Sequence, residues 1–185
     1  KRVMLIGPGG AGKATLARKM GASLGVPVHH LDRLNWRPNW VPTPKEEWMR
    51  IQEDLCAEAE WIIDGNYSGT MDIRLRACDT VVFLDLSRWL CVFRALKRSV
   101  LYSGKPRPDM TEGCDERFNL EFLGFLRWIW DYPQTKRPGI LQQLEEMKED
   151  KRVIILRSRR EVDRFLRSLF GSRGTLLRQL AINTI

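Results

Sequence analysis

The sequence predicts an α/β fold in which a doubly wound parallel sheet carries helices on both faces. Short apolar runs of strand character alternate along the chain with segments whose apolar residues recur at the helical period. The run at 80–86 is rich in apolar and β-branched residues, as is typical of a central parallel strand. Because no repeat or linker divides the 185 residues, we expect one domain over residues 1–170 and a tail at 171–185.

A glycine-rich segment joins the first predicted strand, residues 3–6, to the first predicted helix, residues 14–24. The segment consists of Gly7, Pro8, Gly9, Gly10, Ala11, Gly12, Lys13, Ala14 and Thr15. A strand, a loop of this spacing and a helix are the context of a phosphate-binding loop, in which backbone N–H groups and the helix N-terminus surround an anion. Lys13 adds a full positive charge. We predict nucleotide binding here, the alternative being a plain glycine-rich turn.

One position of this loop departs from the usual pattern. A hydroxyl is expected directly after the lysine as a ligand of Mg²⁺, whereas the chain has Ala14, with Thr15 one position later. The loss affects a metal ligand, while the backbone N–H groups and Lys13 remain. We therefore expect phosphate binding to persist and the metal to be held by Thr15, by water or by a carboxylate from elsewhere.

The second predicted strand, residues 26–31, delivers Asp32 to the carboxyl edge of the sheet, where ligands of open α/β sheets bind. Asp32 is a candidate for contacting an acceptor hydroxyl or acting as base, and a capping or surface role is equally compatible with the sequence. The irregular loop at 35–42 contains Trp36 and Trp40. We expect these rings to anchor the loop to the core, with a stacking platform for a flat substrate as the alternative.

The next predicted helix begins at a capping box. Thr43 is expected to be the N-cap, Pro44 the first helical residue and Glu46 the residue that closes the box.

Residues 61–67 are predicted to form a buried strand with a polar end, which holds Asp64, Asn66 and Tyr67. An aspartate at the end of a strand beside a phosphate loop can hold Mg²⁺ directly or through water. The alternative is a turn in which Asp64 is solvated.

A long helix is predicted from its cap at Ser87 to about residue 102. Its buried side is expected to follow four apolar residues, which are Leu90, Phe93, Leu96 and Val100. Arg94 and Arg98 are four residues apart and so share a face, which suits a phosphate contact or an exposed basic surface equally.

The segment at 103–116 has no periodicity and is polar and basic, so we expect a short lid over the phosphates or a plain surface connection. Two helices follow, the first marked by Phe118, Phe122, Phe125 and Ile129 and expected to end near residues 131–133, and the second opening at Pro138. The last strand is predicted at 152–156 and is followed by a final amphipathic helix.

Charge and composition narrow the function classes. Of the net charge of +8, residues 151–185 carry +7, with 9 Lys+Arg against 2 Asp+Glu. Weak DNA binding through this basic end is possible, although a solvated basic helix face explains the charge as well. Four cysteines lack metal-ligand spacing, and neither a membrane span nor a signal peptide is evident, so we expect reduced thiols and a cytoplasmic protein. The oligomeric state is not predicted.

Several stretches together are more specific than the glycine-rich loop alone, and they are residues 7–13, 30–36, 61–67, 83–86 and 107–109. On these residues the chain resembles the adenylate-kinase-like P-loop proteins of bacteria known as topology modulation proteins of the FlaR type. The resemblance covers roughly residues 1–170. It implies a three-layer P-loop NTPase fold with a five-stranded parallel sheet in the nucleoside monophosphate kinase order, and ATP with Mg²⁺ as cofactors.

The resemblance also implies roles for individual residues. The nucleotide-binding residues would be Gly7, Gly9, Gly10, Ala11, Gly12, Lys13, Ala14, Thr15, Arg94 and Arg159. The catalytic residues would be Lys13, Asp64, Arg98 and the lid residue Arg107, with Asp64 and Thr15 at the metal. The acceptor would contact Asp32, Asn66, Tyr67 and Arg74.

Because residues 66–68 replace the Phe-Pro-Arg that follows Asp-Gly in adenylate kinases, AMP is not the expected acceptor. We predict an ATP-binding phosphotransferase that moves the γ-phosphoryl group to a small nucleotide or metabolite. The alternative is a nucleotide-binding regulator of DNA topology or of a protein partner, with weak or no kinase activity.

Overall fold

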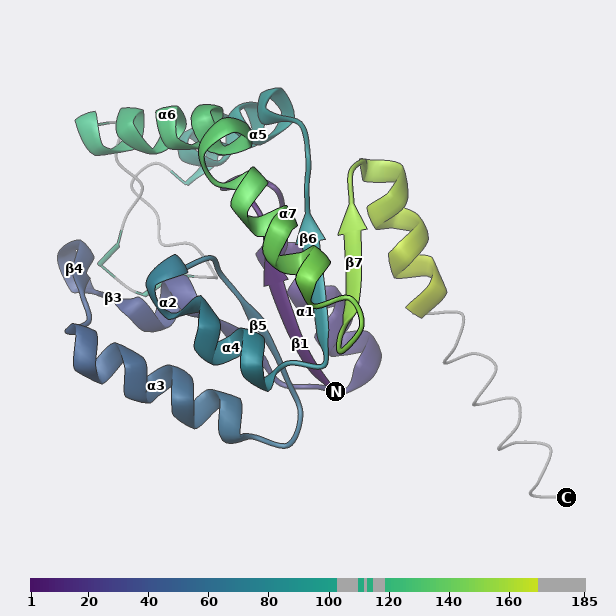
Figure 1. Cartoon of the computed structure of the whole chain (residues 1–185). Helices are drawn as coiled ribbons and strands as arrows, with labels where there is room; N and C mark the ends of the chain where they lie inside the picture. The colour runs from purple at the N-terminus through teal and green to yellow at the C-terminus, as the bar shows by residue number, and fades with distance from the viewer. Residues whose placement is uncertain (103–109, 112, 115–118, 170–185) are drawn as a thin grey trace, which may run out of the picture.

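The computed structural model describes residues 1–102, 110–111, 113–114 and 119–169. Its centre is a parallel five-stranded sheet in the spatial order β2-β5-β1-β6-β7 (Figure 1). In chain order the strands are β1 (Arg2–Ile6), β2 (Val28–His30), β5 (Trp61–Asp64), β6 (Thr80–Leu84) and β7 (Arg152–Leu156). The predicted fold class and the five parallel strands are therefore confirmed.

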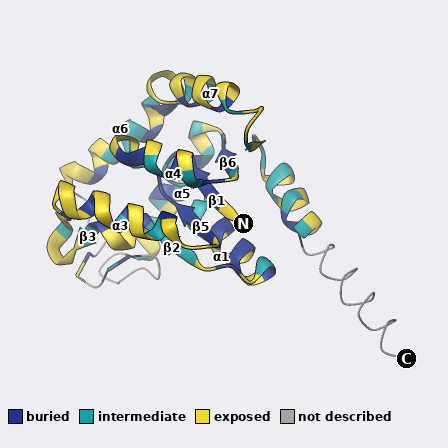
Figure 2. Cartoon of the chain, turned by 60° about the horizontal axis from the view of Figure 1, so that its bottom comes forward, coloured by how far each residue is buried: buried dark blue, intermediate teal, exposed yellow. Residues whose placement is uncertain are grey.

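Helices cover both faces of this sheet because its strand residues alternate between two apolar clusters. Val3 and Leu5 of β1 face one cluster, whereas Met4 and Ile6 face the other. The three central strands, β5, β1 and β6, are the most deeply buried of the five (Figure 2). The helices are α1 (Lys13–Leu24), α2 (Leu31–Asn35), α3 (Lys45–Ala57), α4 (Met71–Ala77), α5 (Arg88–Leu101), α6 (Leu120–Thr135), α7 (Arg137–Glu146) and a last helix that includes residues 159–169.

The layers follow from these clusters. Helices α1, α5 and the last helix pack on one face, and α3, α4 and α7 pack on the other. Helix α6 contacts both clusters, through Ile129 and Tyr132, and lies across the end of the sheet to which the strands point (Figure 1). It continues past Pro133, where the sequence predicted its end.

The predicted buried side of α5 is wrong at two of its four positions, whereas Leu90 packs against the core as predicted. Phe93 and Val100 are 62% and 71% exposed, and the side that packs on the core consists of Cys91, Ala95 and Ser99. Small residues are needed there because the glycine-rich loop packs directly on the helix backbone, and a Cβ at Gly10 would overlap the Cys91 carbonyl. The apolar pattern alone predicted large residues on the buried side, whereas the close approach of the loop at Gly10 to the backbone of α5 requires small ones.

The predicted capping box is also wrong. The α3 helix begins at Lys45, with Pro44 as its N-cap residue and no side-chain cap. The Thr43 hydroxyl instead donates to the Asn35 carbonyl at 2.9 Å. This bond closes the loop at 35–42, where β3 (Trp36–Arg37) and β4 (Val41–Pro42) pair antiparallel across η1 (Pro38–Trp40).

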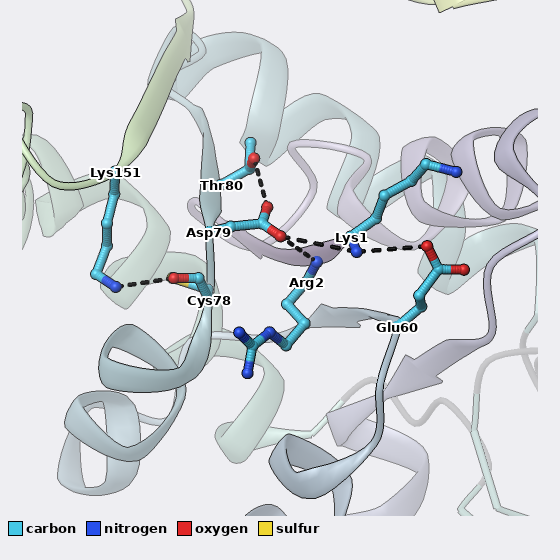
Figure 3. A network of polar contacts seen from close by, with 7 residues as sticks. All are labelled: Lys1, Arg2, Glu60, Cys78, Asp79, Thr80 and Lys151. Carbon is cyan, nitrogen blue, oxygen red and sulfur yellow. Dashed lines mark hydrogen bonds and ion pairs between the residues drawn. The ribbon is translucent and has the colours of Figure 1, made fainter.

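A polar network holds the amino ends of the strands together (Figure 3). Asp79 accepts a 2.8 Å bond from the Arg2 backbone N–H and another of 2.8 Å from the Thr80 hydroxyl. The Lys151 ammonium donates to the Cys78 carbonyl at 2.8 Å, which joins the start of β7 to the residues before β6. These contacts fix the alignment of β1, β6 and β7 at their amino ends, which we call the amino edge of the sheet. The glycine-rich loop lies at the opposite, carboxyl ends of the strands, the carboxyl edge.

Candidate functional site

The glycine-rich loop runs from the end of β1 to the start of α1 at the centre of the sheet. Gly7, Gly10 and Gly12 have φ values of 147°, 76° and 93°, which side-chain-bearing residues rarely adopt. Gly12 is the left-handed N-cap of α1, so Lys13 is the first helical residue. This is the strand, loop and helix arrangement of a phosphate-binding loop, as the sequence predicted.

Lys13 reaches back over this loop from the first turn of α1. Its ammonium group donates to the carbonyl oxygens of Gly7 at 2.9 Å and Pro8 at 3.1 Å. Burial lowers the pKa of Lys13 below its usual value, although the nearby charges of Asp32 and Asp64 act to raise it. A desolvated cation that is held by neutral carbonyls can exchange them for phosphate oxygens, which are better partners for its charge.

Asn66 fixes the start of the loop. Its side-chain oxygen accepts from the Gly7 backbone N–H at 3.0 Å, and its amide group donates to the Gly7 carbonyl at 2.8 Å. The side chain was predicted to contact the acceptor. Although Asn66 does line the cavity described below, its amide is engaged by the loop backbone, so it positions the loop relative to β5.

Arg74 is a correction to the predicted acceptor contacts. The side chain is fully buried, does not line the cavity, and donates to the carbonyls of Gly65 at 2.7 Å and Asn66 at 2.5 Å. A third bond, of 3.2 Å, goes to Tyr67, whose φ of 39° is left-handed. Burial lowers the pKa of Arg74 to about 10. Arg74 therefore stabilises the strained turn at 65–67 by donating to its backbone carbonyls from the buried side, away from the cavity.

Two carboxylates stand at the ends of β2 and β5. Asp64 ends β5 and is buried, and its Oδ2 atom lies 3.0 Å from Nδ1 of His30. Asp32, in the first turn of α2, accepts a 2.9 Å bond from the Tyr67 hydroxyl. Burial and the Asp32 charge raise the pKa of Tyr67, so the phenol stays protonated and donates. Both aspartates line the cavity, as does Tyr67.

The sequence reasoning missed His30. Its strand is too short for a clear periodic signal, yet the parallel register pairs His30 with Asp64 across neighbouring strands. Once β2 and β5 are known to be adjacent, two polar residues at their carboxyl ends are expected to meet. The missing information was the strand order.

Arginines from α5 and the last helix, which follow β6 and β7, line the cavity on the other side of the loop from the two aspartates. Arg94 of α5 donates to the Ala11 carbonyl at 3.2 Å, and the guanidinium carbon of Arg98 lies 5.9 Å from the Phe125 ring centre. Arg159 begins the last helix. All three line the same cavity, so the sheet order brings together the arginines that the sequence predicted as nucleotide-binding or catalytic residues.

The cavity that these residues share has a volume of about 990 Å³. It extends along the carboxyl edge of the sheet, from Trp36 and Trp40 near β2 to Val162 of the last helix. Helix α6 contributes Phe122 and Phe125 to its wall. Trp36 and Trp40 contact each other edge to face, with ring centres 5.6 Å apart, and both line the cavity, so a stacking platform, the alternative to core anchors, stays open. The cavity is large enough for a nucleotide and a small second molecule.

The residues around the loop fit Mg²⁺ held largely by phosphate oxygens and water. Ala14 offers no ligand, whereas Thr15 and the Asp64 carboxylate both line the cavity. No cluster of three or more metal-ligating His, Cys, Asp or Glu side chains occurs within the described residues. Since Mg²⁺ usually keeps several waters and takes one or two carboxylates together with substrate phosphates, the arrangement suits a metal that arrives with a nucleotide.

Some sequence-based predictions lie outside the described residues. Arg107 and most of the predicted lid at 103–116 belong to this group, as does the tail at 171–185. Within the described part of the chain, no helix is long and apolar enough to cross a membrane, and the four cysteines are free and buried.

Comparison with known proteins gives a fold but no family. No protein-family model matches the chain, and no curated protein matches it in sequence. A gluconokinase from Sinorhizobium meliloti 1021 aligns with a TM-score of 0.50 and 14% identity, over 99% of this chain and 97% of that one. A sugar kinase from Janibacter sp. HTCC2649 aligns more loosely, with a TM-score of 0.45 and 17% identity over 95% and 93% of the two chains.

The gluconokinase likeness confirms the predicted P-loop kinase-like fold. At this identity it concerns the fold alone. The narrower resemblance to topology modulation proteins is not tested by these structures and stays a prediction.

Proposed function

We propose that the chain is a phosphotransferase that moves the γ-phosphoryl group of ATP to a small acceptor. One observation carries the proposal. A phosphate-binding loop with a desolvated lysine opens into a cavity that has arginines toward β6 and β7 and two carboxylates toward β2 and β5. Phosphoryl transfer needs this separation, because cations must neutralise the phosphates while polar groups orient the attacking acceptor.

In this proposal the two substrates would occupy different parts of the cavity. The nucleotide phosphates would lie on the backbone N–H groups of residues 9–13, with Lys13 against the outer phosphates. Arg94 and Arg98 would neutralise charge from the α5 side, and Arg159 would border the base. When bound, Mg²⁺ would supply further charge neutralisation, with Asp64 and Thr15 as the residues that hold it directly or through water.

The acceptor would occupy the part of the cavity near β2. Asp32 lines it with a carboxylate that is oriented by the Tyr67 hydroxyl, so it can accept a hydrogen bond from an acceptor hydroxyl. Trp36 and Trp40 offer apolar surface on the same side. Asn66 and Arg74 would act indirectly. Asn66 holds the glycine-rich loop and Arg74 holds the turn at 65–67, which together position the residues that line the cavity.

The missing hydroxyl at Ala14 makes the test specific. We would measure acceptor-dependent ATP consumption with a set of nucleoside, sugar, polyol and nucleotide acceptors, using the wild type, Ala14→Ser and Lys13→Met. We expect turnover in the wild type, an increase of roughly tenfold or more in Ala14→Ser through a better metal site, and none in Lys13→Met. ATP binding without turnover in either of the first two proteins would refute the kinase and favour a nucleotide-binding regulator.

A further inference from the structure

The outward face of α5 carries a stripe of large apolar side chains that is largely exposed in the described part of the chain. Trp89, Phe93 and Val100 are exposed by 71%, 62% and 71%, and the partly exposed Leu96 lies between the last two. Successive members are four, three and four residues apart. This spacing is the seam of a helix that packs lengthwise against another helix.

Helix α6 continues the same surface. Leu120, Leu123 and Trp130 are exposed by 85%, 49% and 37%. The rings of Trp89 and Trp130 meet edge to face at 4.6 Å, so the exposed stripes of α5 and α6 meet at these two residues. Of the ten exposed large hydrophobic side chains among the described residues, seven lie on α5 and α6, and Leu101 is the seventh. We call these seven residues together with Leu96 the α5–α6 face.

We propose that the α5–α6 face binds the same face of a second copy of this chain. The seven exposed side chains offer roughly 800 Å² of apolar surface, which is about what one partner contributes to a standard stable interface. Such a patch is larger than a monomer usually leaves exposed.

The stripe on α5 is complementary to itself. When two copies of α5 cross antiparallel, Trp89 of one copy lies opposite Val100 of the other, and Phe93 lies opposite Leu96. Each level then pairs a large ring with a smaller aliphatic group, so the stripe can interdigitate about a two-fold axis. Because the α5 stripe is complementary to a second copy of itself, it favours a symmetric dimer.

The charges around the α5–α6 face favour a protein partner over a lipid surface. Arg94 and Arg98 of α5 line the cavity, so their charges are not on the outward side of the helix. Lys97 is exposed on that side. On α6, Arg127 is paired with Asp131 at 3.5 Å. A membrane-binding helix instead carries an excess of cations beside its apolar stripe.

The proposed pairing has a consequence for the cavity. Because α5 presents its stripe outward and its two arginines inward, a second copy would hold in place the helix that positions Arg94 and Arg98. The pairing is inferred from exposed side chains and not from the proposed phosphotransferase activity. It is tested by the mass of the protein in solution, so either proposal can fail without the other.

The test is the mass of the full chain in solution, measured by sedimentation over a roughly hundredfold range of concentration. We expect a dimer in the wild type and a monomer in Phe93→Glu, with the dissociation constant raised by roughly 100-fold or more. Met49→Glu, at an exposed position on α3, is the matched control and should leave the dimer unchanged. Circular dichroism melting establishes that each variant is folded.

If Phe93→Glu does not fold, Val100→Glu at the other end of the stripe takes its place. A wild type that stays monomeric throughout the concentration range would overturn the proposal, as would a folded Phe93→Glu or Val100→Glu that remains dimeric. A monomer that instead co-sediments with anionic phospholipid vesicles would assign the α5–α6 face to a membrane and equally overturn it.

Discussion

The two edges of the five-stranded sheet use charged residues in opposite ways. At the amino edge, Asp79 is half exposed and receives hydrogen bonds from the Arg2 backbone and the Thr80 hydroxyl (Figure 3). At the carboxyl edge, Lys13 is desolvated and donates to neutral carbonyl oxygens while it faces a cavity. The amino edge satisfies its charges locally, whereas the carboxyl edge leaves the Lys13 cation with neutral hydrogen-bond partners beside a cavity.

This difference separates binding from stability. Burial makes the charged form of Lys13 costly, and because Lys13 lines a cavity, water can replace its hydrogen bonds when the side chain is removed, so its removal should not harm the fold. A polar group that neighbours satisfy contributes to the fold and little to ligand binding. The carboxyl edge contains both kinds, because Arg74 and Asn66 lie among the cavity residues and yet bond to backbone. Substitutions at the amino and carboxyl ends of the strands therefore test this difference.

The largest effect is expected from Lys13→Met. Phosphoryl transfer should fall by roughly 10³-fold or more, because the cation at the outer phosphates is lost. The melting temperature should stay the same or rise, since burial lowers the pKa of Lys13 and its charged form is costly. Steady-state kinetics and calorimetry on the same preparation check both parts. A clear drop in melting temperature would place Lys13 among the structural residues.

Arg74→Met should be the most destabilising of these changes. The carbonyls of Gly65, Asn66 and Tyr67 lose their donor, and we expect a loss of about 3 kcal/mol in the free energy of unfolding. Urea denaturation measures it. Arg76→Met, an exposed pair with Asp72 on the same helix, is the control, with a change of about 0.5 kcal/mol or less. Equal effects of the two substitutions would contradict the assigned role.

Asn66→Ala should affect both properties moderately. The two hydrogen bonds to Gly7 disappear, so unfolding should become easier by about 1–2 kcal/mol. The loop start is then less fixed, and nucleotide affinity should weaken by roughly tenfold. Denaturation and ATP titration give the two numbers. An unchanged affinity would show that the loop keeps its shape without this side chain.

The smallest effect is expected at the amino edge, from Asp79→Asn. Although partial burial acts to raise it, hydrogen bonds from the Arg2 amide and the Thr80 hydroxyl lower the pKa of Asp79. Its carboxylate therefore stabilises the fold at neutral pH, by about 0.5 kcal/mol or less because it is half exposed. The difference between the two proteins should vanish as the pH falls through the lowered pKa of Asp79. A difference that persists in acid would need another cause.

Local sequence patterns predicted the parts of the molecule that local physics decides. The glycine spacing before Lys13, the apolar strands and the acid at the end of β5 each depend on a few neighbouring residues. The predicted site at the carboxyl edge followed from them, since parallel strands end on the same side.

What the sequence could not predict depends on contacts between distant segments. The inward face of α5 is set by the packing of the glycine-rich loop at Gly10 against Cys91, and helical periodicity alone selected the opposite stripe. Asn66 and Arg74 bond to backbone and not to an acceptor because of the backbone groups that the loop and the turn leave unpaired, which local sequence does not show. His30 meets Asp64 because β2 neighbours β5, which is a matter of strand order.

The proposed function requires that the cavity at the carboxyl edge bind a nucleotide through Lys13 and the glycine-rich loop. Calorimetric titration of ATP with Mg²⁺ into the wild type, Lys13→Met and Asp79→Asn tests it most directly. We predict one binding site per chain in the wild type and in Asp79→Asn, and a loss of affinity of roughly 100-fold or more in Lys13→Met. Equal ATP binding by all three proteins, or none by the wild type, would contradict the claim.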